Sequence, residues 1–136
     1  MFIEWTKDFS VDIESIDEQH QILFTIINRL HNAVLGKIEL DVIGLTFQEL
    51  INYTDSHFKT EEYYMDLYGY PQTQEHKKQH EYFVKEVKNL QNQLHKNQQI
   101  YTLLVDTWIL LKKWLTVHIQ KEDKAYSPFF KEKGIK

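Results

Sequence analysis

Cysteine is absent from the 136 residues of the chain, which excludes disulfide bonds, thiolate metal sites and cysteine nucleophiles. Only four glycines and two prolines are present, which disfavours a β-rich fold with many tight turns. Basic residues are in the minority, with 16 Lys and Arg against 20 Asp and Glu. The resulting net charge of −4 argues against a protein that binds nucleic acid, because such a protein needs a basic face.

Long apolar runs are also missing. A membrane-spanning helix needs roughly 18 or more apolar residues, and the candidate run Trp108–Leu111 is interrupted by Lys112 and Lys113. The N-terminus MFIEWTKDFS does not combine a basic region with an apolar stretch, so it does not resemble a signal peptide. We therefore expect a cytoplasmic protein with no membrane insertion.

Helical periodicity is the main pattern that is present. Apolar stripes spaced by threes and fours occupy about residues 18–36, 41–67, 73–94 and 100–120. Gly36 offers a stop after the first stripe, and a polar segment, His95–Gln99, is predicted to be a turn before the last. Four such stretches joined by short loops predict an all-α fold, an antiparallel up-down four-helix bundle.

The chain as a whole, residues 1–136, is predicted to be a single domain. Residues 1–17 show no helical period and are expected to form an N-terminal arm that lies over the core. Residues 121–136 are expected to form a C-terminal segment. Its short helix is predicted to be capped by Ser127 and to begin with Pro128, because proline suits the first helical position.

Histidine is more frequent than a chain of this length needs, and its placement is unusual. Of seven histidines, five lie on the predicted inward faces: His20, His57, His76, His80 and His118. Burying them together with carboxylates costs several kcal/mol each unless a partner compensates. A metal ion is such a partner, since imidazole nitrogens and carboxylate oxygens are both good ligands. The alternative is a set of core histidines that hydrogen-bond locally.

Two further histidines and a tyrosine are weaker candidates. His31 lies eleven residues after His20, about three turns along the same face, and is expected at the end of the bundle or behind the ligands. His95 falls at a predicted helix C-terminus, where the helix dipole favours it. Tyr126 either hydrogen-bonds near Asp123 or packs at the surface.

Carboxylates accompany the histidines at helical spacing. Glu61 follows His57 by four residues, so both side chains project from nearly one face, whereas the rival Glu62 points off that face. By chance alone, a histidine followed four residues later by an acid is expected roughly once in such a chain. The evidence for a metal site is therefore the combined placement of these residues on the inward faces, and not this pair alone.

The acid that accompanies His118 is ambiguous. Glu122 lies four residues later and shares the face of His118 in a straight helix, so geometry favours it. Asp123 lies five residues later, about 140° away, and can point inward only if the helix ends or widens into a π-turn.

The donor set restricts the kind of metal site. Five histidines and two carboxylates are too many for one tetrahedral zinc ion, and they suit two first-row ions. The Glu-x-x-His motif of carboxylate-rich di-iron bundles and the H-E-x-x-H motif of zinc proteases are both absent. A histidine-rich di-iron pair remains.

The ordered set resembles the pattern of the hemerythrins, in particular the single-domain bacteriohemerythrins, over nearly the whole chain. The matching positions are His20, His57-x-x-x-Glu61, His76-x-x-x-His80 and His118-x-x-x-x-Asp123. The resemblance implies two iron ions with an oxo or hydroxo bridge. It assigns three histidines (His76, His80, His118) to one iron and two (His20, His57) to the other, with Glu61 and Asp123 bridging. It thus selects Asp123 over Glu122.

The resemblance also implies reversible dioxygen binding, for storage, delivery or sensing, at an open coordination position on the two-histidine iron. An oxygen-consuming protein partner would then receive the dioxygen. Apolar side chains beside the ligands match an apolar dioxygen pocket: Leu23, Phe58, Trp114, Leu115 and Ile119. Helical spacing alone would make them ordinary core residues. The alternative functions are a di-iron redox enzyme (an oxidase, a peroxidase or a nitric-oxide-handling catalyst), a zinc site, or a metal-free bundle.

Overall fold

The structure, a computed structural model, describes residues 3–36, 40–94 and 100–136; the expectations for His95 and for the His95–Gln99 turn lie outside these residues. The regular elements of the described residues are all helices, with no strand among them, as the periodicity predicts. Its elements are a 3-10 helix η1 (Lys7–Phe9), α1 (Glu14–Val34), α2 (Leu40–Tyr68), α3 (Thr73–Leu94), α4 (Ile100–Val117), a π-helix η2 (His118–Asp123) and α5 (Lys124–Glu132).

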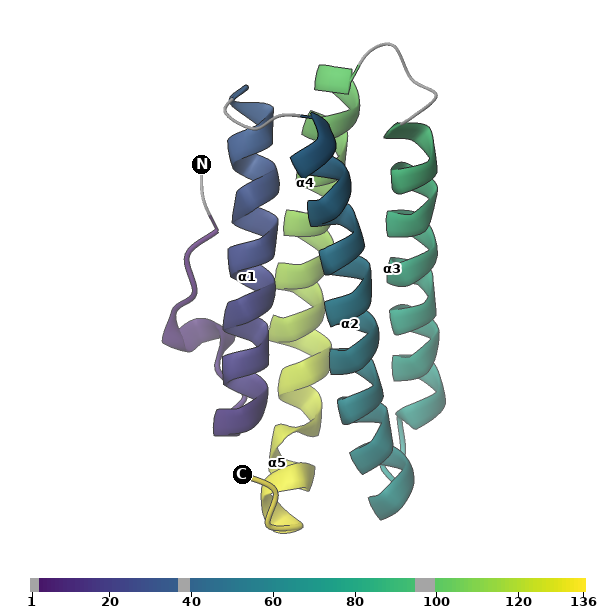
Figure 1. Cartoon of the computed structure of the whole chain (residues 1–136). Helices are drawn as coiled ribbons and strands as arrows, with labels where there is room; N and C mark the ends of the chain where they lie inside the picture. Colours follow the sequence, from purple (N-terminus) through teal and green to yellow (C-terminus); the bar gives the residue numbers. More distant parts are fainter. Residues whose placement is uncertain (1–2, 37–39, 95–99) are drawn as a thin grey trace.

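The four long helices run alternately up and down and pack as a ring around one interior (Figure 1). Helices α1 and α3 each contact both α2 and α4. Glycines with positive φ end α1 and α2, at Gly36 (74°) and Gly69 (68°), and after Gly69 the Tyr70 N–H bonds back to the Met65 carbonyl at 3.0 Å. Such a left-handed residue closes a helix because it directs the following N–H groups back to the last carbonyls.

Helix α1 begins at Glu14, four residues before the start near Glu18 that the pattern predicts. Asp17, an acid counted with the arm, lies within its first turn. The Asp17 carboxylate accepts hydrogen bonds from the Val11 N–H at 2.9 Å and the Ser10 hydroxyl at 2.6 Å. These hydrogen bonds between the helix and the arm stabilise the additional residues at the start of α1. A prediction from apolar periodicity does not include such polar contacts.

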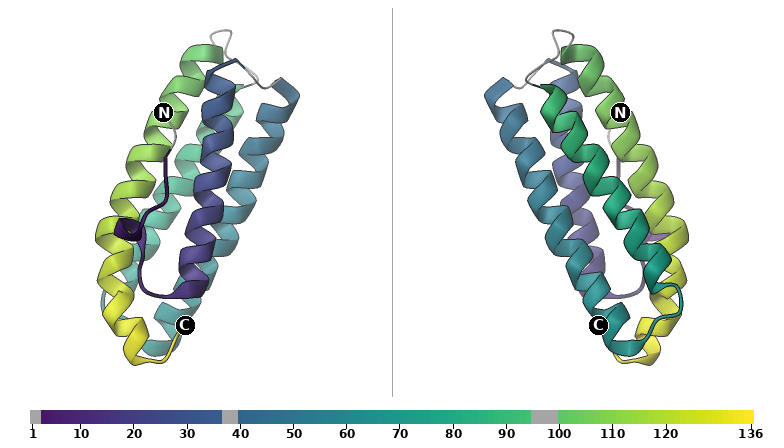
Figure 2. Two further views of the ribbon diagram at one scale, coloured as in Figure 1. Left: turned by 90° about the vertical axis from the view of Figure 1, so that its left-hand side faces the viewer. Right: turned by 90° about the vertical axis from the view of Figure 1, so that its right-hand side faces the viewer.

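The N-terminal arm crosses the face formed by α1 and α4 (Figure 2, left). The side chain of Asn28 in α1 holds it there with a pair of hydrogen bonds. Its Oδ1 accepts from the Ile3 N–H and its Nδ2 donates to the Ile3 carbonyl, both at 3.0 Å. The Ile3 side chain is buried in the core and is joined there by Phe9.

Replacing Asn28 with alanine is expected to loosen the arm. Two hydrogen bonds are lost, so the free energy of unfolding should fall by about 1–2 kcal/mol. Urea unfolding measures the change. The matched control is Thr25→Ala on the same helix, whose hydroxyl bonds only to the Gln21 carbonyl at the surface. Equal stabilities for the two variants would show that Asn28 does not hold the arm.

The C-terminal helix differs from the prediction. Helix α5 begins at Lys124, directly after η2, so Ser127 is not its cap and Pro128 is not its first residue. Ser127 is buried and its hydroxyl donates to the Val11 carbonyl, which ties α5 to the arm. Tyr126 and Phe130, on the same side of the helix as Ser127, are fully buried and hold α5 against the interior.

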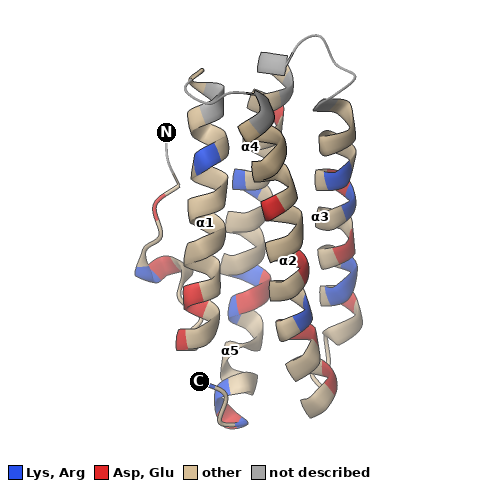
Figure 3. Cartoon of the chain, viewed as in Figure 1, with Lys and Arg blue, Asp and Glu red and all other residues tan. Residues whose placement is uncertain are grey.

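Charged residues of both signs alternate along the outer faces of the helices (Figure 3). Within the described ranges, none of the helices combines the length and the apolar composition that crossing a membrane requires.

Candidate metal centre

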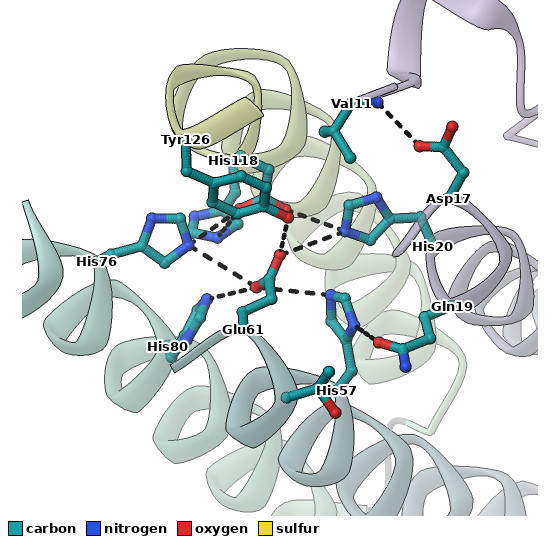
Figure 4. Close-up of polar contacts among 12 residues, drawn as sticks. Val11, Asp17, Gln19, His20, His57, Glu61, His76, His80, His118 and Tyr126 are labelled. Atoms are coloured by element: carbon teal, nitrogen blue, oxygen red, sulfur yellow. Dashed lines mark hydrogen bonds and ion pairs between the residues drawn. The ribbon is translucent and has the colours of Figure 1, made fainter. Parts of the chain in front are cut away.

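The seven predicted donor side chains converge in the interior, and none is more than 3% exposed. One comes from α1 (His20), two from α2 (His57, Glu61), two from α3 (His76, His80) and two from η2 (His118, Asp123). Figure 4 shows the labelled histidines gathered around Glu61. Two apolar clusters flank this polar layer: the main core, which includes Leu23 and Phe83, and a smaller one around Met65 and Phe130.

The donors form two overlapping groups, in each of which one ligand atom per residue lies within 4.8 Å of the others. One group is Glu61, His76, His80, His118 and Asp123, and the other is His20, His57, Glu61 and Asp123. Both groups contain both carboxylates. The arrangement therefore suits two adjacent cations that share Glu61 and Asp123.

The inward-facing atoms of this cluster lack hydrogen-bond partners among the described residues. They are the Nε2 atoms of His20, His76, His80 and His118, Oε1 of Glu61 and both Oδ atoms of Asp123. His76 and His118 Nε2 each lie 3.0 Å from Asp123 Oδ1, but these contacts do not have hydrogen-bond geometry. Buried polar atoms are normally paired, so this concentration of unpaired nitrogen and oxygen atoms fits a metal site.

In three of the five histidines, the opposite ring nitrogen is paired with a side chain. Nδ1 of His57 lies 2.5 Å from Gln19 Oε1, and Nδ1 of His118 lies 2.8 Å from Gln79 Oε1. Nδ1 of His80 lies 2.8 Å from Glu62 Oε2. With Nδ1–H donating to these acceptors, each Nε2 is left with a lone pair directed at the cluster. This is the tautomer that a metal ligand requires.

These acceptors are functional residues that periodicity did not identify. Gln19 and Gln79 directly precede His20 and His80, so they point sideways toward a neighbouring helix and not along the inward stripe. Glu62, the rival to Glu61, is absent from both donor groups and instead bonds His80 from behind. The repeated Gln-His dipeptide was the one available clue in the sequence.

The π-helix resolves the ambiguity between Glu122 and Asp123. Widening of the turn over His118–Asp123 brings Asp123 inward, where it is 1% exposed and belongs to both donor groups. Glu122 is half-buried and lines a groove between α3 and α4 instead. The straight-helix preference for Glu122 is therefore wrong, because the helix is not straight there.

The cluster favours positive charge. Burial by itself lowers the pKa of His20 and of His76, but the nearby Asp123 and Glu61 carboxylates outweigh it and raise these values to about 9 and about 10. Burial lowers the pKa of His57 to about 4. The surrounding histidines hold the pKa of both carboxyls well below its usual range, although burial opposes this. Two ionised carboxylates in the interior thus require compensating cations.

Tyr126 belongs to the site and not to the surface. Its side chain is fully buried between His76 and Phe130, and its hydroxyl donates a hydrogen bond to Glu61 Oε2. Burial and the neighbouring carboxylates raise its pKa well above the usual value, so the phenol stays protonated. The bond orients Glu61 and leaves Oε1 as the carboxylate oxygen without a hydrogen-bond partner.

Apolar side chains enclose the ligands on the core side. Leu23, Phe58, Leu115 and Ile119 are buried in the main core, and Trp114 is half-buried against it. The Phe58 ring stacks on His80 with 3.8 Å between ring centroids, and the Trp114 ring stacks on His118 at 4.4 Å.

His31 is buried far from the donor groups. Its ring contacts Trp108 with 5.1 Å between centroids, and it belongs to neither group of ligand atoms.

Comparison with known proteins gives a consistent result. A family model described as "Hemerythrin HHE cation binding domain" matches residues 11–130. The "Bacteriohemerythrin" of Pseudomonas aeruginosa (strain LESB58) is 36% identical over 122 residues, which are 90% of this chain and 77% of that protein. The "Bacteriohemerythrin" of Methylococcus capsulatus is 33% identical over 125 residues, covering 91% and 93%.

A solved structure, "Crystal structure of hemerythrin:wild-type", shares 32% of its sequence with this chain. It superposes with a TM-score of 0.82 and covers 94% of this chain and 97% of that one.

Proposed function

Because the chain belongs to the hemerythrin family, we propose that it binds dioxygen reversibly at a di-iron centre, for oxygen storage, delivery or sensing. The observation that supports this most directly is the set of buried, unpaired imidazole and carboxylate atoms that face one another in two overlapping groups. In a delivery role, the dioxygen would pass to an oxygen-consuming protein partner.

The proposed ligands follow from the membership of the two groups. His76, His80 and His118 would hold one iron, and His20 and His57 the other. Glu61 and Asp123 would hold both, since they belong to both groups. The unequal number of histidines leaves the two-histidine iron with one fewer protein ligand.

When bound, the iron pair would supply the electrons and the open coordination position for dioxygen. The chain's own contribution is to exclude water and proton donors. Leu23, Phe58, Leu115 and Ile119 offer no polar side-chain atom, and each is 3% exposed or less. The hydroxyl of Tyr126, which reaches the site, is already donated to Glu61. Such surroundings favour binding over further reaction of the bound gas.

The test is purification of the full chain with iron, followed by metal analysis and visible spectroscopy. We expect two irons per chain and an absorption band that appears in air, fades under vacuum and returns over repeated cycles. Prompt, irreversible oxidation of the reduced protein by air would contradict the proposal and support a redox enzyme. Zinc, or no metal, after purification without added iron would contradict it in favour of a structural site.

Exchanging Leu115 for tyrosine is expected to accelerate the loss of bound dioxygen. Leu115 is 1% exposed and lies three residues before His118, one turn away, so the new phenol would introduce a proton donor in place of an apolar side chain. We expect autoxidation to be faster by about tenfold or more. Absorbance in air measures the rate, and Leu115→Phe, which has the same bulk without the hydroxyl, is the control. Equal rates for wild type and both variants would argue against this placement of the pocket.

A further inference from the structure

Three of the site histidines have a side-chain partner on the ring nitrogen that faces away from the cluster, and the three partners are not equivalent. His57 and His118 face the amide oxygens of Gln19 and Gln79. His80 faces a carboxylate oxygen of Glu62 at 2.8 Å. An amide and a carboxylate orient an imidazole equally well, but only the carboxylate adds a negative charge.

From this difference we infer that Glu62 is a positioning residue that sets the electron donation of one ligand. Its hydrogen bond from His80 Nδ1 fixes the ring and places a full negative charge behind the three-histidine half of the metal centre. A carboxylate behind a metal-bound histidine makes the imidazole more basic and strengthens its bond to the metal. Extra negative charge also favours the more highly charged, oxidised state of the metal. The inference rests on the proposed function in that it takes His80 to be a ligand.

The contacts of His80 support a fixed geometry. Its ring is stacked against Phe58, with 3.8 Å between centroids and 3° between planes, while Glu62 holds its edge. The stacked Phe58 ring thus restrains tilting of the His80 ring, and the hydrogen bond to Glu62 restrains rotation within the ring plane. The ring is 1% exposed, so the hydrogen bond to Glu62 is not open to exchange with bulk water.

The outer side of Glu62 faces solvent and two cations. Its side chain is 26% exposed and lines a groove of about 500 Å3 between α2 and α3. The ammonium groups of Lys59 and Lys77 interact with it electrostatically. Water and these two cations stabilise the carboxylate on its outer side, while its inner side accepts from His80. Gln79, by comparison, lines a groove with Lys113, Lys121 and Glu122, and the atom that pairs with His118 Nδ1 there is the neutral amide oxygen of Gln79.

The test separates the charge of Glu62 from its hydrogen bond. Glu62→Gln keeps an acceptor and removes the charge, whereas Glu62→Ala removes both. Gln79→Glu adds the missing charge behind His118. Asp55→Asn is the matched control. It removes one negative charge from the same groove, but Asp55 pairs with Lys59 and belongs to neither donor group. Circular dichroism establishes that each full-length variant is folded.

Two readouts are needed, and the first does not depend on iron. Titration of the metal-free chain with Co2+ against a competing chelator should show binding about tenfold weaker in Glu62→Ala, or weaker still, with Glu62→Gln intermediate. Asp55→Asn should bind as the wild type does. In the iron-loaded protein, the midpoint potential should become more positive in Glu62→Gln and more negative in Gln79→Glu.

If Glu62→Gln matches Asp55→Asn in both Co2+ affinity and potential, the inference is overturned and the contact is only packing. Failure of the wild type to bind dioxygen reversibly, with the Co2+ ranking intact, would instead overturn the proposed function and leave the role of Glu62 in place.

Discussion

Replacement of Glu61 with alanine is expected to leave the protein with one bound iron or none per chain instead of two. Glu61 belongs to both donor groups, so its loss removes an oxygen ligand from each proposed iron position at once. No other described carboxylate than Asp123 shares this membership. The remaining histidines also lose the negative charge that favours a cation among them. Metal analysis of the purified variant measures the effect.

The control for this experiment is Glu49→Ala on the same helix, whose carboxylate pairs with Arg29 at the surface. It should retain two irons per chain. Full iron content in the Glu61 variant would contradict the shared role of Glu61 and would require the two ions to be held independently.

Removal of the metal is expected to destabilise the folded chain strongly. A ligand that binds only the native state stabilises it by an amount that grows with the logarithm of the ratio of free ligand to dissociation constant, about 2.7 kcal/mol at a hundredfold excess. For a domain of this size, the thermal midpoint should fall by about 10 °C or more when a chelator removes the ions. The stability lost is that of a layer in which ionised carboxylates and unpaired imidazole nitrogens lie together without a cation.

Calorimetry of the full chain before and after chelation measures this shift. The variant His118→Ala serves as a control, because loss of one ligand should reduce the chelator-dependent shift. An identical midpoint for the wild type with and without chelator would show that no metal contributes to its stability.

The four-helix architecture could be predicted from the sequence because burial is periodic. The inward stripe of α3 illustrates this: His76, His80, Phe83 and Val87 are all buried, and the helix has the bounds 73–94 that the pattern indicates. Two residues of this stripe are histidines, and a helical bundle has little reason to bury so many imidazoles on one level unless they share a partner.

The start of α1 and the bounds of α5 could not be predicted because contacts outside each helix determine them. The start of α1 depends on Asp17 binding the backbone of the arm, and α5 depends on Ser127 binding the Val11 carbonyl. A rule that examines one segment at a time assigned Asp17 to the arm and Ser127 to a cap. The partner residues lie up to 116 positions away in the chain.

Only part of the candidate site could be predicted from the spacing of residues in the sequence. The histidines follow from periodicity, whereas Asp123 followed only from the family resemblance, since straight-helix geometry favoured Glu122. Gln19 and Gln79 were missed because they support their histidines from adjacent helices, a relation that spacing within one helix does not encode.

The six residues from His118 to Asp123 give α4 and α5 different rotational phases. A π-turn accommodates one residue more than an α-turn, so everything after it is rotated by about 100° relative to a regular continuation. In a regular helix Tyr126, eleven residues after Leu115, would share the face of Leu115. The offset turns α5 away from that face, and Tyr126 and Phe130 pack with Met65 in the smaller apolar cluster, apart from the main core that holds Leu115. The same wide turn therefore has two effects: it directs the Asp123 carboxylate to the interior, and it turns the apolar face of α5 from the main core to the smaller cluster.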